Sequence, residues 1–298
     1  MNKIIVIGSA NTDMVVKCTK LPLPGETVLG GTFFMNAGGK GANQAVAAAR
    51  LGGEVSLVAK VGNDIFGSQT IVGLQKENID TSHVFTEEQS PSGVALIIVN
   101  SEGENCIAVA PGANARLQPA DIETVSLHPY AIILMQLEIP IATITTVVKK
   151  ARGNGQKIIL NPAPAMLLPD EVLSGLFLIT PNETEAAFLT GIAVTDTISA
   201  AKAANILLDK GAQNVIITLG RQGAYFQNKE EAFTTPAPVV EAIDTTAAGD
   251  TFSGAITVAL TENMNWRKAV QFAVAAAALS VTRLGAQASV PYRSELSL

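Results

Sequence analysis

Short apolar runs recur along the chain, and each closes on a glycine or a polar residue. Six stand out, at residues 3–8 (KIIVIG), 55–62 (VSLVAKVG), 131–136 (AIILMQ), 157–161 (KIILN), 176–180 (LFLIT) and 214–220 (NVIITLG). Polar and apolar positions do not alternate within them. This pattern is typical of strands that are covered on both faces of a parallel sheet.

Stretches with helical periodicity lie between these runs. The predicted helices are residues 42–51, 67–77, 141–152 and 198–210. Because strand and helix alternate, we expect right-handed βαβ crossovers. The sequence therefore predicts an α/β fold with a doubly wound, mainly parallel sheet and helices on both faces.

Two stretches break the alternation and contain no crossover helix. Residues 11–35 hold strand-like pieces around the turn-rich LPLPG, and residues 94–110 resemble two strands joined by SEGE. We expect a small β-sheet lid, made of about residues 12–36 and 92–111, on a single domain spanning residues 1–298. Both faces of residues 94–99 are apolar, which suits a lid between a ligand and a partner subunit. The alternative is one more core strand.

The composition narrows the classes of partner. The chain has 20 Lys and Arg against 26 Asp and Glu, a net charge of −6, and 48% of its residues are hydrophobic. So apolar a chain can bury a large core, which excludes intrinsic disorder. An acidic surface without a basic run disfavours nucleic acid and anionic membranes, because their phosphates repel it.

Signals for export, membrane insertion and disulfides are missing as well. The apolar stretch at residues 4–7 is shorter than the ~7–15 residues of a signal peptide. The longest run, residues 272–279, is far below the ~20 residues that span a bilayer. Cys18 and Cys106 are too few for a disulfide framework, which predicts a reduced, cytoplasmic protein. His83 and His128 lie in loop-like surroundings and suggest no catalytic role.

The strongest chemical signal is the segment DTTAAGDTFSG at residues 244–254. Its small residues precede a predicted helix, so the amides near Ala247, Ala248 and Gly249 are free donors at a helix N-terminus, which attracts anions. Asp250 then stands in the first turn, where a carboxylate often only stabilises the helix. Beside an anion hole, it can also accept the proton of an alcohol during phosphoryl transfer.

A second small-residue turn, GGKGAN at residues 38–43, also leads into a helix. It does not match a Walker A loop, and the absence of G-x-G-x-x-G after the first strand disfavours a nicotinamide cofactor. Such a turn is often only a site of tight packing. Lys40 and Asn43 favour ligand binding, because they are polar groups on a backbone that permits close contact.

Further polar residues follow the ends of predicted strands, at the edge where open α/β sheets bind ligands. Each one alone is explained as an N-cap or turn residue. Together with Asp250 on the same edge they predict a polar cluster of Asn11, Asp13, Glu138, Asn182 and Glu185.

These motifs resemble the ribokinase family of carbohydrate kinases over nearly the whole chain. The matching segments are GSANTD (8–13), PGET (24–27), GGKGAN (38–43), NPAP (161–164), TPNETE (180–185), TLGRQG (218–223), DTTAAGD (244–250) and TRLGAQASVP (282–291). DTxAAGD before a helix is specific for the wider family. GGKGAN combined with TRxGAQ is more similar to ribokinases proper than to fructokinases or adenosine kinases.

The resemblance implies a role for each matching position. The sugar ligands would be Asn11, Asp13, Gly39, Lys40, Gly41, Asn43 and Glu138, with Asp250 as the base on the 5-hydroxyl. The anion hole would consist of Ala247, Ala248 and Gly249. The residues that would serve ATP and the water shell of Mg²⁺ are Asn182, Glu185, Thr218, Leu219, Gly220, Gly223 and Gly249. A K⁺ site would use, mostly through backbone oxygens, Asp244, Thr246, Ser280, Arg283, Gly285 and Ser289.

The implied protein is a homodimeric, ATP-dependent pentose kinase, for D-ribose above all. Val274 stands where many family members have a His near the adenine, so this contact would be apolar. Asp13 can accept from two vicinal hydroxyls, so loss of the 2-hydroxyl would cost roughly 1–3 kcal/mol. The alternatives are a preference for 2-deoxyribose, a kinase of another small sugar or nucleoside, and a non-catalytic sugar or nucleotide sensor.

Overall fold

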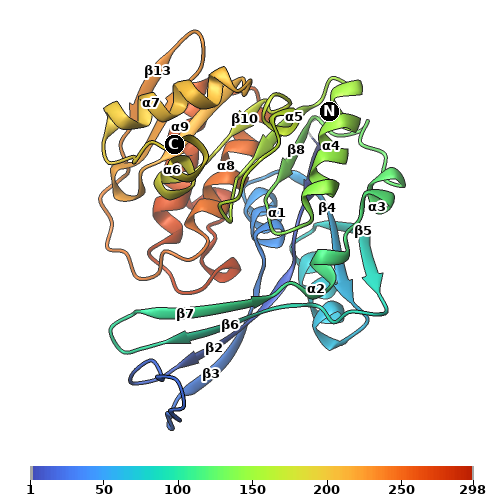
Figure 1. Ribbon diagram of the computed structural model, residues 1–298, viewed down its shortest axis with the longest axis vertical. Coiled ribbons are helices and arrows are strands. Elements are labelled where there is room, and N and C mark those ends of the chain that lie inside the picture. Colours follow the sequence, from blue (N-terminus) through green and yellow to red (C-terminus); the bar gives the residue numbers. More distant parts are fainter. Residues whose placement is uncertain (1–2, 297–298) are drawn as a thin grey trace.

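The structure is a computed structural model that describes residues 3–296. Its main sheet has nine strands, in the order β13-β12-β11-β10-β9-β8-β1-β4-β5 (Figure 1). The strands from β11 to β5 in this order run parallel, and β12 and β13 form an antiparallel extension. The bounds are β1 (Lys3–Ile7), β4 (Glu54–Gly62), β5 (Asp80–Glu87), β8 (Ile132–Met135), β9 (Lys157–Leu160), β10 (Leu178–Ile179), β11 (Asn214–Thr218), β12 (Ala224–Gln227) and β13 (Ala232–Thr235).

Helices cover both faces of this sheet. One face carries α1 (Lys40–Arg50), α2 (Ile65–Lys76), α8 (Ala248–Thr261) and α9 (Trp266–Ser280). The other carries α3 (Pro119–Glu123), α4 (Ile141–Gly153), α5 (Asp170–Leu173), α6 (Glu183–Thr190) and α7 (Thr197–Asp209). The sequence of β1 is apolar without interruption because each face of the strand packs into a different core. Ile5 and Ile7 lie in one core, and Ile4 and Val6 lie in the other. The predicted doubly wound fold is confirmed.

All six predicted strands are present, and all lie in the parallel part of the sheet. The sequence did not predict β5, β12 or β13. The edge strands β5 and β13 bury one face at most, so their sequences, DTSHVFTE and AFTT, lack a continuous apolar run, and β12 (AYFQ) joins β13 to the parallel part.

A separate small sheet projects from the body of the molecule (Figure 1). Its order is β3 (Thr32–Gly38), β2 (Asn11–Lys17), β6 (Gly93–Val99) and β7 (Asn105–Ala110). Strands β2 and β6 are parallel, whereas the outer pairs are antiparallel. The predicted separate sheet is confirmed, and the alternative of one more core strand is wrong.

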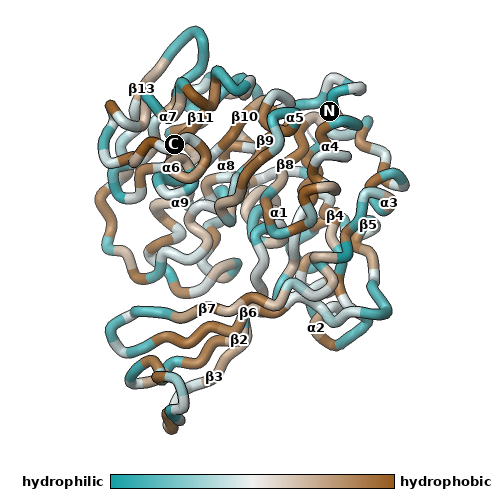
Figure 2. Tube along the Cα trace, viewed as in Figure 1, coloured by the Kyte–Doolittle hydropathy of each residue, from teal (hydrophilic) through white to brown (hydrophobic). Residues whose placement is uncertain are grey.

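The small sheet is apolar on the side that faces away from the site residue Asp13. Figure 2 shows hydrophobic residues along β2 and β6. The pairing register places Val16, Phe33, Met35 and Leu96 on one face, and they are 36%, 57%, 48% and 53% exposed. We call these four residues the outer apolar face. Among residues 3–296, no helix is long and apolar enough to cross a membrane.

Candidate active site

Four predicted site residues, Lys40, Asn43, Glu138 and Asp250, lie where the strand order of the main sheet changes direction. From β1 the chain continues toward one edge of the sheet, and from β8 it continues toward the other edge. Open α/β sheets form their ligand-binding crevices at such a point. The helices α1 and α8 begin at the same edge. A hydrogen bond of 3.0 Å from Asn43 Nδ2 to Asp250 Oδ2 joins their first turns.

Asp250 lies in the first turn of α8 and is 6% exposed. Its two oxygens accept from Asn43 and from Gln44 Nε2, the latter at 2.9 Å. Burial raises the pKa of Asp250, whereas Lys40 and the two amide donors oppose that rise. The residue lines a cavity of ≈ 200 Å³ together with Ala247, Ala248 and Gly249, the three residues of the predicted anion hole.

The start of α8 leaves main-chain donors free. Ala247 has φ = 59°, which turns the chain sharply into the helix. The first helical bonds run from Ala248 N to Thr245 O (3.3 Å) and from Thr251 N to Ala247 O (2.8 Å). The amides of Gly249 and Asp250 find no acceptor within residues 3–296. A Cβ at Gly249 would meet nothing within 4 Å, so a ligand can approach these amides closely.

Lys40 and three carboxylates surround Asp250. Glu138 Oε2 accepts from Ser9 Oγ (2.5 Å) and from the backbone N–H of Lys40 (3.0 Å), which fixes the start of α1. Burial alone would lower the pKa of Lys40, but Asp250, Glu138 and their neighbours outweigh it and raise that pKa. Lys40 also lines the cavity with Glu185, and its charge interacts with those of Asp13, Glu138, Glu185 and Asp250.

Asp13 faces this cluster from β2 of the small sheet. Burial, together with the charges of Glu138 and Asp250, raises its pKa to about 6. The adjacent strand β3 contributes Gly38, where a Cβ would lie 2.2 Å from Asp13 Oδ2. Glycine is therefore needed beside this carboxylate.

The other predicted sugar ligands are more dispersed. Asn11 Oδ1 accepts from Asn114 Nδ2 at 2.7 Å, and Asn11 lines a second cavity, also of ≈ 200 Å³, rather than that of Asp250. Gly39 has φ = 86° and precedes α1, where a Cβ would lie 2.6 Å from Asn11 N. Gly41 is buried against Ser9, so its role in the structure is close packing of α1.

The same cavity is also lined by Asn182, Glu185 and Thr218. Asn182 caps α6: its Oδ1 accepts from Glu185 N (2.8 Å), and its own N–H donates to Glu185 Oε2 (3.0 Å). Burial raises the pKa of Glu185, against the bond from Asn182. The capping interpretation thus holds for both residues, and both also line the cavity.

The turn after β11 runs from Thr218 to Gly223 through the 3₁₀ turn η2 (Gly220–Gln222). Leu219 N donates to Gly223 O at 2.8 Å. Gly223 has φ = 102°, and a Cβ there would lie 2.0 Å from Thr235 O, so no larger residue fits. Val274, by contrast, belongs to α9, is 5% exposed, packs in the core, and is absent from the cavity lining.

The six residues of the expected K⁺ site come from two segments that the structure holds together. Asp244 accepts from Thr246 N and from Gly285 N, both at 2.9 Å, and these bonds lower its pKa against the effect of burial. The carbonyls of Asp244, Thr246, Arg283, Gly285 and Ser289 accept no hydrogen bond within residues 3–296, whereas Ser280 O accepts from Arg283 N. In the same range, no group of three His, Cys, Asp or Glu could hold a metal. The free carbonyl oxygens are ligands of the kind that hold a monovalent cation.

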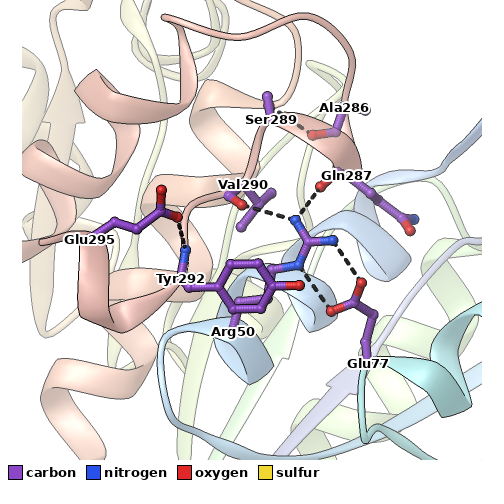
Figure 3. Close-up of polar contacts among 8 residues, drawn as sticks. All are labelled: Arg50, Glu77, Ala286, Gln287, Ser289, Val290, Tyr292 and Glu295. Atoms are coloured by element: carbon purple, nitrogen blue, oxygen red, sulfur yellow. Dashed lines mark hydrogen bonds and ion pairs between the residues drawn. The ribbon is translucent and has the colours of Figure 1, made fainter.

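Arg50 at the end of α1 fixes the second of these segments (Figure 3). Its Nη1 donates to Gln287 O (2.8 Å) and Val290 O (2.9 Å). Its Nε and Nη2 form a bidentate pair with Glu77 at 2.9 and 2.6 Å, and Tyr292 covers the guanidinium at 4.9 Å. Ser289 lies between the two acceptor carbonyls.

Sequence reasoning missed Asn161, which lines the cavity, and the buried amides Gln44 and Gln136, which do not line it. Gln136 and Asn161 close the predicted strands AIILMQ and KIILN, and Gln44 follows Asn43 directly. The rule that selected Glu138, a polar residue at the end of an inner strand, also applies to Gln136 and Asn161. No sequence signal indicates Arg50, because its partners are 27 to 240 residues away.

The doubly wound sheet, the small sheet at its edge and a carboxylate beside free helix N-terminal amides define an α/β enzyme of the sugar kinase class. The chain belongs to the pfkB family of carbohydrate kinases, whose family model matches residues 1–293.

Individual relatives agree over nearly the full length. A ribokinase of Haemophilus influenzae is 44% identical over 292 residues, which cover 97% of this chain and 95% of that protein. A deoxyribokinase of Salmonella typhi is 38% identical over 291 residues, which cover 97% of this chain and 95% of that protein. The solved structure of an Arabidopsis thaliana ribokinase complexed with ribose and ATP has a TM-score of 0.91 at 32% identity, covering 98% of this chain and 96% of that one.

Proposed function

We propose that this protein transfers the γ-phosphoryl group of ATP to the 5-hydroxyl of D-ribose, giving ribose 5-phosphate and ADP. The observation that carries the proposal is the meeting of the Asp250 carboxylate, the free amides of Gly249 and Asp250, and Lys40 on one cavity. Relatives with ribokinase names at 44% and 41% identity support ribose as the sugar.

The chemistry follows from these positions. Asp250 orients the sugar hydroxyl and takes its proton while the oxygen–phosphorus bond forms and the bond from the γ-phosphorus to the β,γ-bridging oxygen breaks. A loose transition state demands orientation more than strong basicity. The free amides and Lys40 balance charge on the transferred group. Asp13, on the small sheet, would accept from the vicinal hydroxyls at the other end of the sugar.

Two cations complete the proposal. Mg²⁺ would neutralise the phosphates of ATP, with Asn182 and Glu185 reaching its water shell. K⁺ would add positive potential beside the anion hole and be held by the carbonyls around Asp244 and Gly285. The turn from Thr218 to Gly223 would lie along the nucleotide. Val274 is assigned no direct contact, because it packs in the core.

We further propose a homodimer that buries the outer apolar face of the small sheet, and a cytoplasmic location. Four large apolar side chains exposed side by side on a sheet favour a protein partner over solvent. The free thiols of Cys18 and Cys106 are consistent with a reducing compartment.

The proposal is tested by ADP release with ribose, Mg²⁺ and K⁺, in the parent protein and in Asp250→Asn. We expect turnover in the parent and a kcat lower by about 10²–10⁴ in the variant, with ribose binding retained. An equal kcat in both proteins would refute the base. No turnover in either would favour the non-catalytic sensor.

A second candidate substrate is 2-deoxyribose, favoured by the 38% identity to the deoxyribokinase. Asp13 argues for ribose, because a sugar without the 2-hydroxyl leaves a half-buried carboxylate without one donor. We expect kcat/KM for ribose to exceed that for 2-deoxyribose by about 10- to 100-fold. Measured preference for the deoxy sugar would reverse the assignment.

A further inference from the structure

Asp250 stands at one end of a buried chain of three side-chain amides. Gln44 Nε2 donates to Asp250 Oδ1 (2.9 Å) and to Asn161 Oδ1 (3.1 Å). Gln136 Nε2 donates to Gln44 Oε1 at 2.6 Å, and Asn161 Nδ2 donates to the backbone carbonyl of Thr180 at 3.1 Å. Gln44 and Gln136 are fully buried, and Asn161 is 6% exposed. Water therefore cannot replace a hydrogen bond that Gln44 or Gln136 loses.

The carbonyl of Thr180 fixes the direction of every bond in the chain. A carbonyl only accepts, so the NH₂ group of Asn161 must face Thr180, and its Oδ1 must face Gln44. Gln44 must then donate to Asn161 and, with its second N–H, to Asp250. If the Gln44 amide turned over, Oε1 would face two acceptor oxygens, which is repulsive in a buried site.

Asn43, which donates to the other oxygen of Asp250, is not fixed in this way. Its Nδ2 donates to Asp250 Oδ2 at 3.0 Å, but its own Oδ1 is buried and has no partner within residues 3–296. Rotating the Asn43 amide by half a turn breaks no hydrogen bond to Asn43 Oδ1. The rotated amide would present this oxygen, an acceptor, to Asp250 Oδ2. Oδ2 can therefore change from acceptor to donor, whereas Oδ1 remains an acceptor.

We propose that Gln44 is a positioning residue that holds Asp250 Oδ1 as a permanent acceptor, so that the proton of the sugar hydroxyl is received on Oδ2. The inference deepens the proposed function and rests on it. In this step the O–H bond of the sugar breaks, its electron pair forms the bond to phosphorus, and the proton passes to Oδ2. The amide of Asn43 turns over and accepts the resulting O–H.

The charged groups around Asp250 are the same with and without Gln44. Lys40 from α1, Glu138 after β8, Asp13 from the small sheet and Glu185 from α6 all act on it. A change at Gln44 alters none of them. Because a donor stabilises the ionised carboxylate, removing it raises the pKa of Asp250 and moves the acid limb of kcat to higher pH.

The test measures kcat against pH in Gln44→Met, at saturating sugar and ATP so that titration of Asp13 during sugar binding does not enter. We expect kcat to fall about 10- to 100-fold and the acid limb to move up by about one pH unit. The Kd for ribose, measured calorimetrically, should change less than about threefold, since Gln44 does not line the cavity.

Gln136→Met is the matched control. It removes one buried amide from the same chain but leaves the path from Thr180 through Asn161 and Gln44 to Asp250 intact. We expect a comparable loss of stability, a kcat within about threefold of the parent and an unmoved acid limb. The other outcome is that both variants lose kcat in proportion to their loss of stability and show the same dependence of kcat on pH. Gln44 would then only support the fold, and the proposal would be overturned.

A direct titration separates this outcome from failure of the proposed function. Protein labelled with ¹³C at the aspartate carboxyls is titrated by NMR in the parent and in Gln44→Met, and Asp250→Asn assigns the signal. If the parent phosphorylates no sugar, the kinase proposal fails, and a higher pKa of Asp250 in Gln44→Met still supports positioning. Equal titration of Asp250 in both proteins overturns the inference.

Discussion

The charged residues of the site are arranged for ligands rather than for stability. Asp13, Glu138, Glu185 and Asp250 share one lysine, Lys40, in a partly buried place. Burial raises the pKa of Asp13, Glu185 and Asp250, which means that each ionised form is disfavoured in the free protein. Donors on a bound sugar, and cations that come with ATP, would relieve this strain.

Asp13 gives the clearest pH dependence at the scale of a single residue. Its pKa of about 6 lies above the ordinary 3.8, so the native protein pays an ionisation penalty that grows from about pH 4 and is complete above about pH 6. We expect Asp13→Asn to raise the free energy of unfolding at pH 8 by about 1–3 kcal/mol, measured by urea denaturation. The same variant at pH 4 should match the parent.

The variant should also bind ribose weakly at every pH, because an amide accepts through one oxygen only. In the parent, the Kd for ribose should rise as the pH falls below about 6, where the carboxyl of Asp13 becomes protonated. A parent Kd that stays constant between pH 5 and pH 8 would contradict the assignment of Asp13 to the sugar hydroxyls.

At the scale of elements, the site depends on how helix ends and loops are held. Glu138 fixes the start of α1, and Arg50 ties its end to Glu77 after α2 and to the segment around Ser289. The side chain of Arg50 is only 12% exposed. The helix that carries Lys40, Asn43 and Gln44 is therefore attached at both ends.

Arg50→Met should be strongly destabilising. It leaves the Glu77 carboxylate unpaired at 22% exposure and removes the donor from two carbonyls. We expect a loss of about 2–4 kcal/mol in the free energy of unfolding, measured by urea denaturation. The control is Arg267→Met: its ion pair with Glu231 is exposed, with the arginine at 66%, and its loss should cost at most about 1 kcal/mol. Equal losses would mean that the Arg50 contacts add little.

At the scale of the whole molecule, the outer apolar face is a set of large apolar side chains that one chain leaves exposed on the small sheet. Phe33 and Leu96 are its most exposed members, at 57% and 53%. Because the inner side of the same sheet carries Asp13, a subunit packed on the outer face would also support the sugar side of the site.

Phe33→Glu combined with Leu96→Glu should yield a monomer, because two charges per chain would be buried without partners at the interface. Light scattering would show the mass of one chain, while the parent shows that of two. Ile198→Glu places a charge at a more exposed apolar residue on α7, at 68% exposure, and should leave the mass unchanged. A parent that is already monomeric would contradict the dimer.

The sequence by itself determined the features that depend on neighbouring residues. Unbroken apolar runs give strands buried on both faces, and the small residues before Asp250 give a helix start with free amides, since both patterns act within a few positions. The sequence did not predict the edge strand β5, because a strand that is buried on one side only has no unbroken apolar run. Only the tertiary structure decided which polar groups meet: Gln44 lies 206 residues from Asp250 and 117 from Asn161. Hydrogen bonds between side chains so far apart depend on strand order and helix placement, and no local pattern encodes them.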